Sequence, residues 1–288
     1  MPRVVKPGTI VGKLRPEIAE EVGLDRVPVV SPACHDTASA ASAVPFSGMY
    51  NNAFISSGTW SVVGIETDEP VINKESFRRN IFNEGAVAGK VIAVSNITGL
   101  WIVQQCKKAW NNAGKKWDWP EMIKKAQSAQ PFTAFIDPDD KAFCNPPDMP
   151  AAIREYCKNT GQKAPEDEGT IIRIALESLA LKYKQALEQI ESLRGKAVDA
   201  LYIVGGGARN NLLNQLTADA TGKTVLAGPV EATAIGNIMM QAIGTGYIKS
   251  IDEARGIIRS SFKIETYLPE NKRDWNNYRK GLKNAGKI

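Results

Sequence analysis

The most constraining feature of the sequence is a short apolar run followed by three glycines and a helical pattern. Residues 201–204 predict a buried strand, and Gly205-Gly206-Gly207 follow it directly. Leucines then recur at helical spacing within residues 210–220. Glycines let a ligand approach the backbone, and a helix start offers free N–H groups to a phosphate. The pattern predicts an α/β fold and favours nucleotide binding over a bare turn.

Alternating strands and helices continue through the rest of the chain, which supports the α/β class. Strands are expected at 27–30, 91–94 and 225–226, a hairpin across 54–63, helices at 99–110, 172–190 and 232–243, and a loop-rich insertion at 131–150. Residues 1–24 are typical of a connecting segment that ends in a short helix. We therefore divide the chain into a connecting segment, 1–30, and one domain, 31–288.

Composition excludes several classes of protein. The 36 Lys and Arg against 31 Asp and Glu leave a net charge of only +5 with no long basic block, which argues against nucleic-acid binding. No apolar run approaches the roughly 20 residues of a membrane span, and no signal peptide is evident. The four cysteines form no C-x-x-C pair, so a cytoplasmic protein is expected. His35 is the only histidine, which removes multi-histidine zinc sites, and no residue is assigned to a metal.

Two familiar nucleotide motifs match only in part. A Walker A motif would use Gly222-Lys223-Thr224 but finds Thr217 where its first glycine belongs, so Gly222 is better interpreted as a helix C-cap. A dinucleotide motif would use Gly205 and Gly207 but has Asn210 in place of its third glycine. A dehydrogenase using NAD therefore remains an alternative.

Two other short segments could carry chemistry. Ser56-Ser57-Gly58-Thr59 predicts a hairpin turn whose hydroxyl and N–H groups could hold phosphate oxygens, with an ordinary hairpin as the alternative. Asp36 lies at a strand-to-helix junction, where its carboxylate could take a proton from a substrate hydroxyl or simply cap the helix. A Ser-His-Asp triad is disfavoured, because Asp36 could hardly orient the imidazole of adjacent His35.

Five segments together resemble one family. They are residues 33–40, ACHDTASA; 55–61, ISSGTWS; 83–85, NEG; 96–101, NITGLW; and 204–210, VGGGARN. In sequence, order and spacing they resemble the FGGY carbohydrate kinases. The resemblance implies an actin-like ATPase fold, in which two RNase H-like domains close over ATP and a sugar. This chain would supply mainly the C-terminal nucleotide-binding domain of such a two-domain sugar kinase.

The resemblance also implies roles for individual residues. Asp36 matches the catalytic base, flanked at the sugar by His35 and Thr37, and Asn96 matches a further sugar contact. Thr59 and Gln104 match ATP contacts, and Gly206 matches the adenosine loop. The remaining residues of the two loops that we assign to the nucleotide are Gly58, Gly205, Gly207 and Asn210. ATP and Mg²⁺ are the implied cofactors.

Within the family, the His35-Asp36-Thr37 triplet and residues 227–237, AGPVEATAIGN, are most similar to the branch that acts on L-rhamnulose. Phosphorylation of the 1-hydroxyl of L-rhamnulose is therefore the expected reaction, and another ketose such as L-fuculose is the alternative. Residues 1–30 contain neither the Asp-x-Gly phosphate motif nor the sugar-binding domain with which the family begins. We therefore expect an N-terminal half of the kinase as a partner, and a non-catalytic nucleotide-binding module remains a competing hypothesis.

Overall fold

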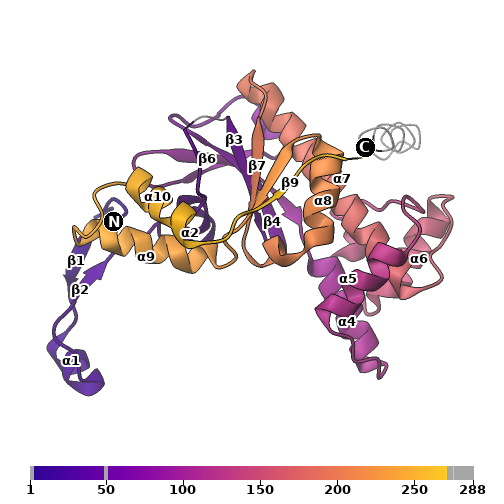
Figure 1. The fold of residues 1–288 in the computed structure, drawn as a ribbon, viewed down its shortest axis with the longest axis horizontal. Coiled ribbons are helices and arrows are strands. Elements are labelled where there is room, and N and C mark those ends of the chain that lie inside the picture. Colours follow the sequence, from indigo (N-terminus) through magenta and orange to yellow (C-terminus); the bar gives the residue numbers. More distant parts are fainter. Residues whose placement is uncertain (1–2, 49–50, 271–274, 276–288) are drawn as a thin grey trace.

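A mixed seven-stranded sheet forms the centre of the computed structural model, which describes residues 3–48, 51–270 and 275 (Figure 1). The strand order is β5-β6-β4-β3-β7-β8-β9. The strands are β3 (Asn52–Ser57), β4 (Trp60–Thr67), β5 (Phe82–Gly85), β6 (Val91–Thr98), β7 (Ala200–Val204), β8 (Thr224–Ala227) and β9 (Glu265–Tyr267). Strands β3, β7 and β8 run parallel, and the other neighbours are antiparallel. The C-terminal ends of β3, β6, β7 and β8 consequently meet at one edge of the sheet.

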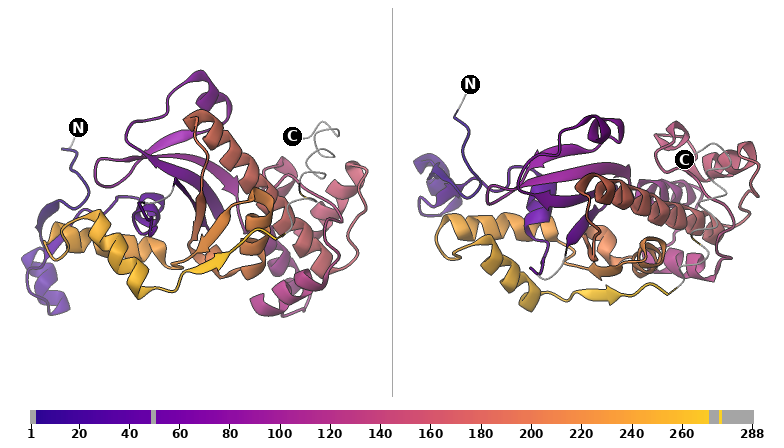
Figure 2. Two further views of the ribbon diagram at one scale, coloured as in Figure 1. Left: turned by 45° about the horizontal axis from the view of Figure 1, so that its top comes forward. Right: turned by 90° about the horizontal axis from the view of Figure 1, so that it is seen from above.

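Helices cover both faces of this sheet, as Figures 1 and 2 show. One face packs against α2 (Asp36–Ser42), α9 (Ala232–Gly244) and α10 (Ile251–Ser261), and the other against α7 (Glu168–Arg194) and α8 (Asn211–Thr221). Side chains alternate between the faces, so Phe54 and Tyr202 lie under α2 while Ile55 and Ile203 lie under α7. The apolar runs of β3 and β7 are thus explained, since both of their faces are buried.

The long helix α7 is well defined by its sequence. The Asp167 carboxylate accepts a hydrogen bond from the N–H of Thr170 at 2.9 Å and caps the start, and Gly195 in the left-handed conformation, with φ 68°, ends it. Helices α4 (Trp101–Asn112), α5 (Trp119–Ser128) and α6 (Met149–Asn159) share the core on this side, with the short turn η1 (Lys141–Phe143). Each large apolar side chain buried there contributes about 1.5–3 kcal/mol.

The N-terminal residues form an arm that projects from the sheet (Figure 1). Strands β1 (Ile10–Lys13) and β2 (Pro28–Val30) pair antiparallel, with α1 (Pro16–Val22) between them. All four β1 residues are exposed, although Ile10 and Val11 are apolar. The arm therefore presents apolar surface to its surroundings.

Most of the predicted elements are confirmed, with bounds that extend further than the apolar runs. The expected hairpin, glycine loop and C-cap at Gly222 are present. Strand β6 continues to Thr98, four residues beyond its predicted end. The sequence interpretation missed β1, β5, β9, α3 (Lys74–Arg78), α5, α6 and α10. Across the described ranges, no helix is both long and apolar enough to cross a membrane.

Candidate active site

The turn between β3 and β4 lies at the sheet edge where the C-terminal strand ends meet. Gly58 donates its N–H to the carbonyl of Trp60 at 2.9 Å, so this N–H is not free, contrary to our expectation. The carbonyls of the turn instead accept hydrogen bonds from the N–H groups at the start of α4. The Leu100 N–H donates to the Gly58 carbonyl at 2.9 Å, and the Trp101 N–H donates to the Thr59 carbonyl at 3.1 Å. The structure therefore brings Thr59 next to the helix turn that carries Gln104.

The glycine loop packs directly on the end of β3. Gly205 has φ 85°, and a Cβ there would lie 2.8 Å from the Ser57 carbonyl oxygen. A Cβ on Gly207 would lie 2.6 Å from the Ser57 Cβ and closer still to its Oγ. Gly206 is exposed, its φ is not positive, and a Cβ there would meet no atom of the described chain within 4 Å. Any requirement for positive φ therefore falls on Gly205 rather than Gly206, and Gly206 faces open space.

The last residue of this loop, Asn210, has a structural task. Its side-chain oxygen accepts the N–H of Leu213 at 3.0 Å and caps α8. From the same helix, the Asn214 amide donates to the Ala208 carbonyl at 2.9 Å within the short turn η2 (Gly206–Arg209). Helix α8 thus fixes the loop that precedes it.

Asp36 is the first residue of α2, and its side chain is exposed. The interpretation of Asp36 as the N-cap is wrong, because the His35 Nδ1 takes that position and accepts the Ala38 N–H at 3.3 Å. One Asp36 oxygen accepts the Thr37 N–H at 2.7 Å. From α9, the Thr233 hydroxyl donates to the Asp36 carbonyl at 3.5 Å. The backbone of the His35-Asp36-Thr37 triplet is therefore held while its carboxylate remains accessible.

Glu84 is a neighbour of this triplet to which the sequence analysis gave no role. Its Oε2 lies 3.7 Å from the His35 Nδ1 and is buried without a hydrogen-bond partner in the described part of the chain. Burial raises the pKa of the Glu84 carboxyl, the His35 ring opposes the rise, and Asp36 adds to it. The contact could not be inferred from sequence, because it depends on the pairing of β5 with β6.

Asn96 is exposed on β6. It lies on the sheet face that α2 covers further along, since Ile92 and Val94 lie four and two residues before it. The strand register places it in one row with Val62, Ser56 and Val204. The row ends beside Gly205. The predicted sugar contact Asn96 and the predicted nucleotide loop therefore share one region of the sheet. Asn96 also borders a hollow of about 410 Å³ with the aromatic residues Phe77 and Phe82. A larger hollow of about 770 Å³, between α5 and the start of α7, contains none of the candidate residues.

The sequence profile of the FGGY family of carbohydrate kinases, C-terminal domain, matches residues 53–245. The chain belongs to the FGGY family of carbohydrate kinases. A rhamnulokinase from Bacteroides thetaiotaomicron is 45% identical over 273 residues, 95% of this chain and 55% of that protein. The Bacillus subtilis rhamnulokinase is 39% identical over 269 residues, 93% and 54% respectively. The chain therefore spans about half the length of the curated relatives it matches.

Solved structures of FGGY kinases share the fold. A ligand-bound xylulose kinase from Lactobacillus acidophilus superposes with a TM-score of 0.70 at 13% identity, over 100% of this chain and 56% of that one. Plasmodium falciparum glycerol kinase with ADP gives 0.69 at 15% identity, over 97% and 55%. The expected actin-like fold is confirmed, and the NAD-dehydrogenase alternative is wrong. The individual roles of His35, Asp36, Thr37, Asn96 and the loop residues remain predictions.

Proposed function

We propose that this chain is the nucleotide-binding half of a kinase that transfers the γ-phosphoryl group of ATP to L-rhamnulose, giving L-rhamnulose 1-phosphate. The observation that carries the proposal is the match to rhamnulokinases at 39–45% identity over more than nine-tenths of the chain. The shared sheet region of Asn96, the Gly58-Thr59 turn and the glycine loop supports it, since a phosphoryl donor and acceptor must lie side by side.

In this mechanism the exposed Asp36 carboxylate would accept the proton of the 1-hydroxyl as that oxygen bonds to the γ-phosphorus of ATP. The bond from the γ-phosphorus to the bridging oxygen would break, and ADP would leave. Phosphoryl transfer needs little covalent chemistry from a protein, so positioning and charge stabilisation dominate. His35, Thr37 and Asn96 would hold the other oxygens of the ketose. The Thr233 hydrogen bond to the Asp36 backbone would keep the base in place as the sugar binds.

The nucleotide would bind along the edge formed by the Gly58-Thr59 turn and the glycine loop. The loop leaves room for ATP at Gly206, because the space beside its Cα is open and, apart from Gly206 and its chain neighbours, no described atom lies within 4 Å of where a Cβ would be. Gln104, on the first turn of α4, would add a polar contact. The Plasmodium falciparum glycerol kinase structure, which contains ADP, has the same fold, and this supports a nucleotide site on the fold.

Mg²⁺ is implied by the reaction, since it neutralises phosphate charge when bound. Among the described residues there is no group of three or more His, Cys, Asp or Glu side chains that could hold a metal ion. The chain's own residues therefore do not fit a dedicated metal site, and we derive no step through the ion.

The opposite wall of the cleft would come from a second domain that corresponds to the part of the relatives' length not covered here. Apolar surface is available for such a contact: Trp60 at the turn is 64% exposed and Phe77 is 85% exposed. Asp36 and Asn96 are also exposed, whereas a kinase excludes water during transfer. A non-catalytic nucleotide-binding module is the second candidate, favoured by this open site.

A test of the proposal joins this chain to the N-terminal half of the Bacteroides thetaiotaomicron rhamnulokinase and measures ADP release with ATP. L-rhamnulose, L-fuculose, D-xylulose and glycerol are the substrates. We expect turnover with L-rhamnulose to exceed turnover with each of the other three. Turnover on glycerol but not L-rhamnulose would overturn the substrate, and nucleotide binding with no turnover on any sugar would favour the non-catalytic module.

A further inference from the structure

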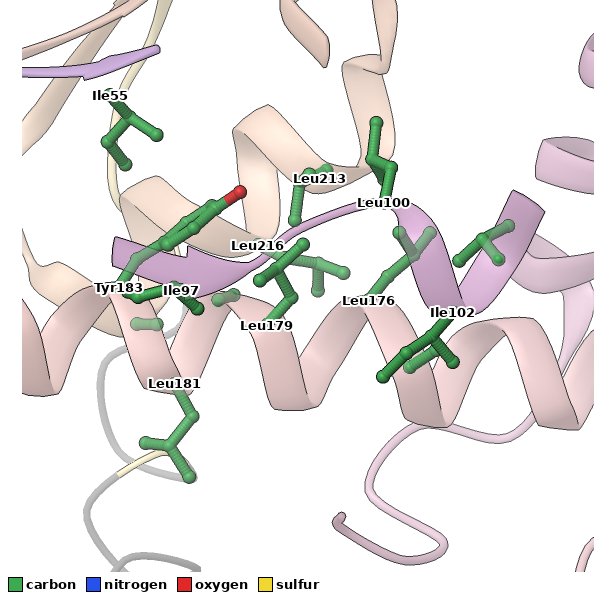
Figure 3. Packing of buried hydrophobic residues seen from close by; sticks show 14 of the residues in the cluster. Ile55, Ile97, Leu100, Ile102, Leu176, Leu179, Leu181, Tyr183, Leu213 and Leu216 are labelled. Carbon is green, nitrogen blue, oxygen red and sulfur yellow. The ribbon is translucent and has the colours of Figure 1, made fainter. Parts of the chain in front are cut away.

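Tyr183 is fully buried on α7, yet its hydroxyl reaches the candidate nucleotide site. Figure 3 shows its ring rising from α7 on the side of Ile55 and Leu213, opposite to Leu181. The hydroxyl lies 2.6 Å from the Ser61 Oγ and 3.5 Å from the Ser57 Oγ. These two serines flank the Gly58-Thr59 turn, so one side chain of α7 contacts both ends of the hairpin tip.

The two serines also touch the other parts of the site. Ser57 fills the space beside Gly205 and Gly207, where a Cβ on either would collide with it. Ser61 does the same at Gly99, whose Cβ would lie 2.6 Å from the Ser61 Oγ. The Tyr183 hydroxyl therefore binds the two serines that pack against the glycine loop and against the start of α4.

Helix α7 anchors the same edge a second time through the preceding residue. The Lys182 ammonium lies 2.8 Å from an Asp137 oxygen and 2.9 Å from an Asp139 oxygen, and the other Asp139 oxygen accepts the Thr98 N–H at 2.8 Å. Thr98 pairs with Trp60 across β6 and β4. Both anchors therefore end at the β3–β4 turn.

We infer that Tyr183 is a positioning residue for the nucleotide site, whose hydroxyl holds the Gly58-Thr59 turn and the glycine loop in one fixed relation. The inference rests on the proposed function, because it takes these two loops as the nucleotide-binding elements. Burial raises the pKa of Tyr183 to about 12, although both serine hydroxyls oppose the rise. The phenol thus keeps its proton at physiological pH and serves as a neutral hydrogen-bonding group.

Packing alone would not need the hydroxyl, so Tyr183→Phe separates positioning from core filling. Tyr202→Phe is the matched control. Tyr202 is also buried, but it lies on the opposite face of the sheet, where its ring packs edge-on against the Phe46 ring with 5.4 Å between the ring centroids. Ser61→Ala removes the nearer partner of the Tyr183 hydroxyl. The double variant of Tyr183→Phe and Ser61→Ala shows whether the two changes act on one interaction. If they do, the effect of the double variant is little larger than that of either single variant.

The experiment measures hydrogen–deuterium exchange of the 288-residue chain, by peptides that cover 56–61, 97–101, 205–210 and, as reference, α9. A lost internal hydrogen bond changes such an equilibrium by about two- to tenfold. We expect Tyr183→Phe and Ser61→Ala to accelerate exchange by this factor in both the turn and the glycine loop, with α9 and the Tyr202→Phe control unchanged. Uniform acceleration that includes α9, acceleration of the turn without the glycine loop, or no change would each overturn the inference.

Isothermal titration with ADP on the same samples separates this inference from the proposed function. We expect the dissociation constant to rise about two- to tenfold in Tyr183→Phe, with Tyr202→Phe unchanged. Equal affinity of Tyr183→Phe and the parent chain would overturn the positioning role. If the parent chain binds no ADP, the nucleotide proposal fails, and the exchange pattern still decides whether Tyr183 couples the two loops.

Discussion

Alanine substitution along Gly205-Gly206-Gly207 should separate the two glycines that pack closely from Gly206, which we propose faces the nucleotide. In Gly207→Ala the new Cβ would lie 2.6 Å from the Ser57 Cβ and 3.1 Å from its carbonyl oxygen. These atoms lie in the end of a buried strand and cannot swing away, so overpacking should cost about 1–3 kcal/mol. In Gly205→Ala, the backbone conformation of φ 85° and ψ −174°, which essentially only glycine adopts, adds about 1–3 kcal/mol of strain. The new Cβ would also lie 2.8 Å from the Ser57 carbonyl oxygen.

Gly206→Ala is the matched control, because the same methyl group there meets no described atom within 4 Å and φ is not positive. Its free energy of unfolding should stay within about 0.5 kcal/mol of the parent chain. Gly206→Val should likewise fold but bind ADP more weakly, since the side chain enters the proposed nucleotide space.

Urea unfolding gives the free energies, and thermal melting should shift by about 2–4 °C for each kcal/mol. Titration with ADP on the same samples gives the dissociation constant for ADP. Equal stability of Gly207→Ala and Gly206→Ala would refute the close packing on Ser57. Unchanged ADP affinity in folded Gly206→Val would mean that the glycines serve only the turn.

Two further substitutions test the sugar side. In the fusion of this chain with the N-terminal half of the Bacteroides thetaiotaomicron rhamnulokinase, Asp36→Asn should lower kcat by roughly 10²–10⁴-fold, because a general base is lost. The KM for ATP should change little. A near-normal kcat would remove Asp36 from the mechanism. Glu84→Gln should raise the melting temperature at pH 8, because the raised pKa of Glu84 means that ionisation costs folding free energy above that pKa. The gain should shrink as the pH falls to about 4.3, where the carboxyl of the unfolded chain is half protonated, and a gain that grows on acidification would contradict the raised pKa.

The elements that determine the fold could be predicted because each carries its own local signal. The long helix has a 3.6-residue apolar repeat and a terminal glycine, and the strand before Gly205 is continuously apolar because both of its faces are buried. Strand β5 could not be predicted in this way, because its sequence shows no apolar–polar alternation: apolar Phe82 and charged Glu84 face the same side. Only its pairing with β6 makes it a strand. Helix α10 does carry a local signal, because Ser250 is its N-cap and Ala254 and Ile258 lie on one face.

The candidate site was predictable as a set of segments but not as an arrangement. The triplet at Asp36 and the two small-residue turns stand out by composition. Their common location depends on the strand register that aligns Asn96 with Ser56 and Val204, which the sequence does not encode locally. The sequence gives no sign of a positioning role for Tyr183, because it occupies an apolar position of the helical repeat and its hydroxyl partners lie more than 120 residues away.

The most direct test of the central proposal is L-rhamnulose-dependent ADP release by the 288-residue chain, measured alone and after fusion to the N-terminal half of the Bacteroides thetaiotaomicron rhamnulokinase. The described residues offer an exposed proposed base, Asp36, and one proposed nucleotide edge. Loss of positioning in an open site removes several orders of magnitude of rate. We predict weak ADP binding and no measurable turnover by the chain alone, and sugar-dependent turnover by the fusion. Robust turnover on L-rhamnulose by the chain alone would contradict the account.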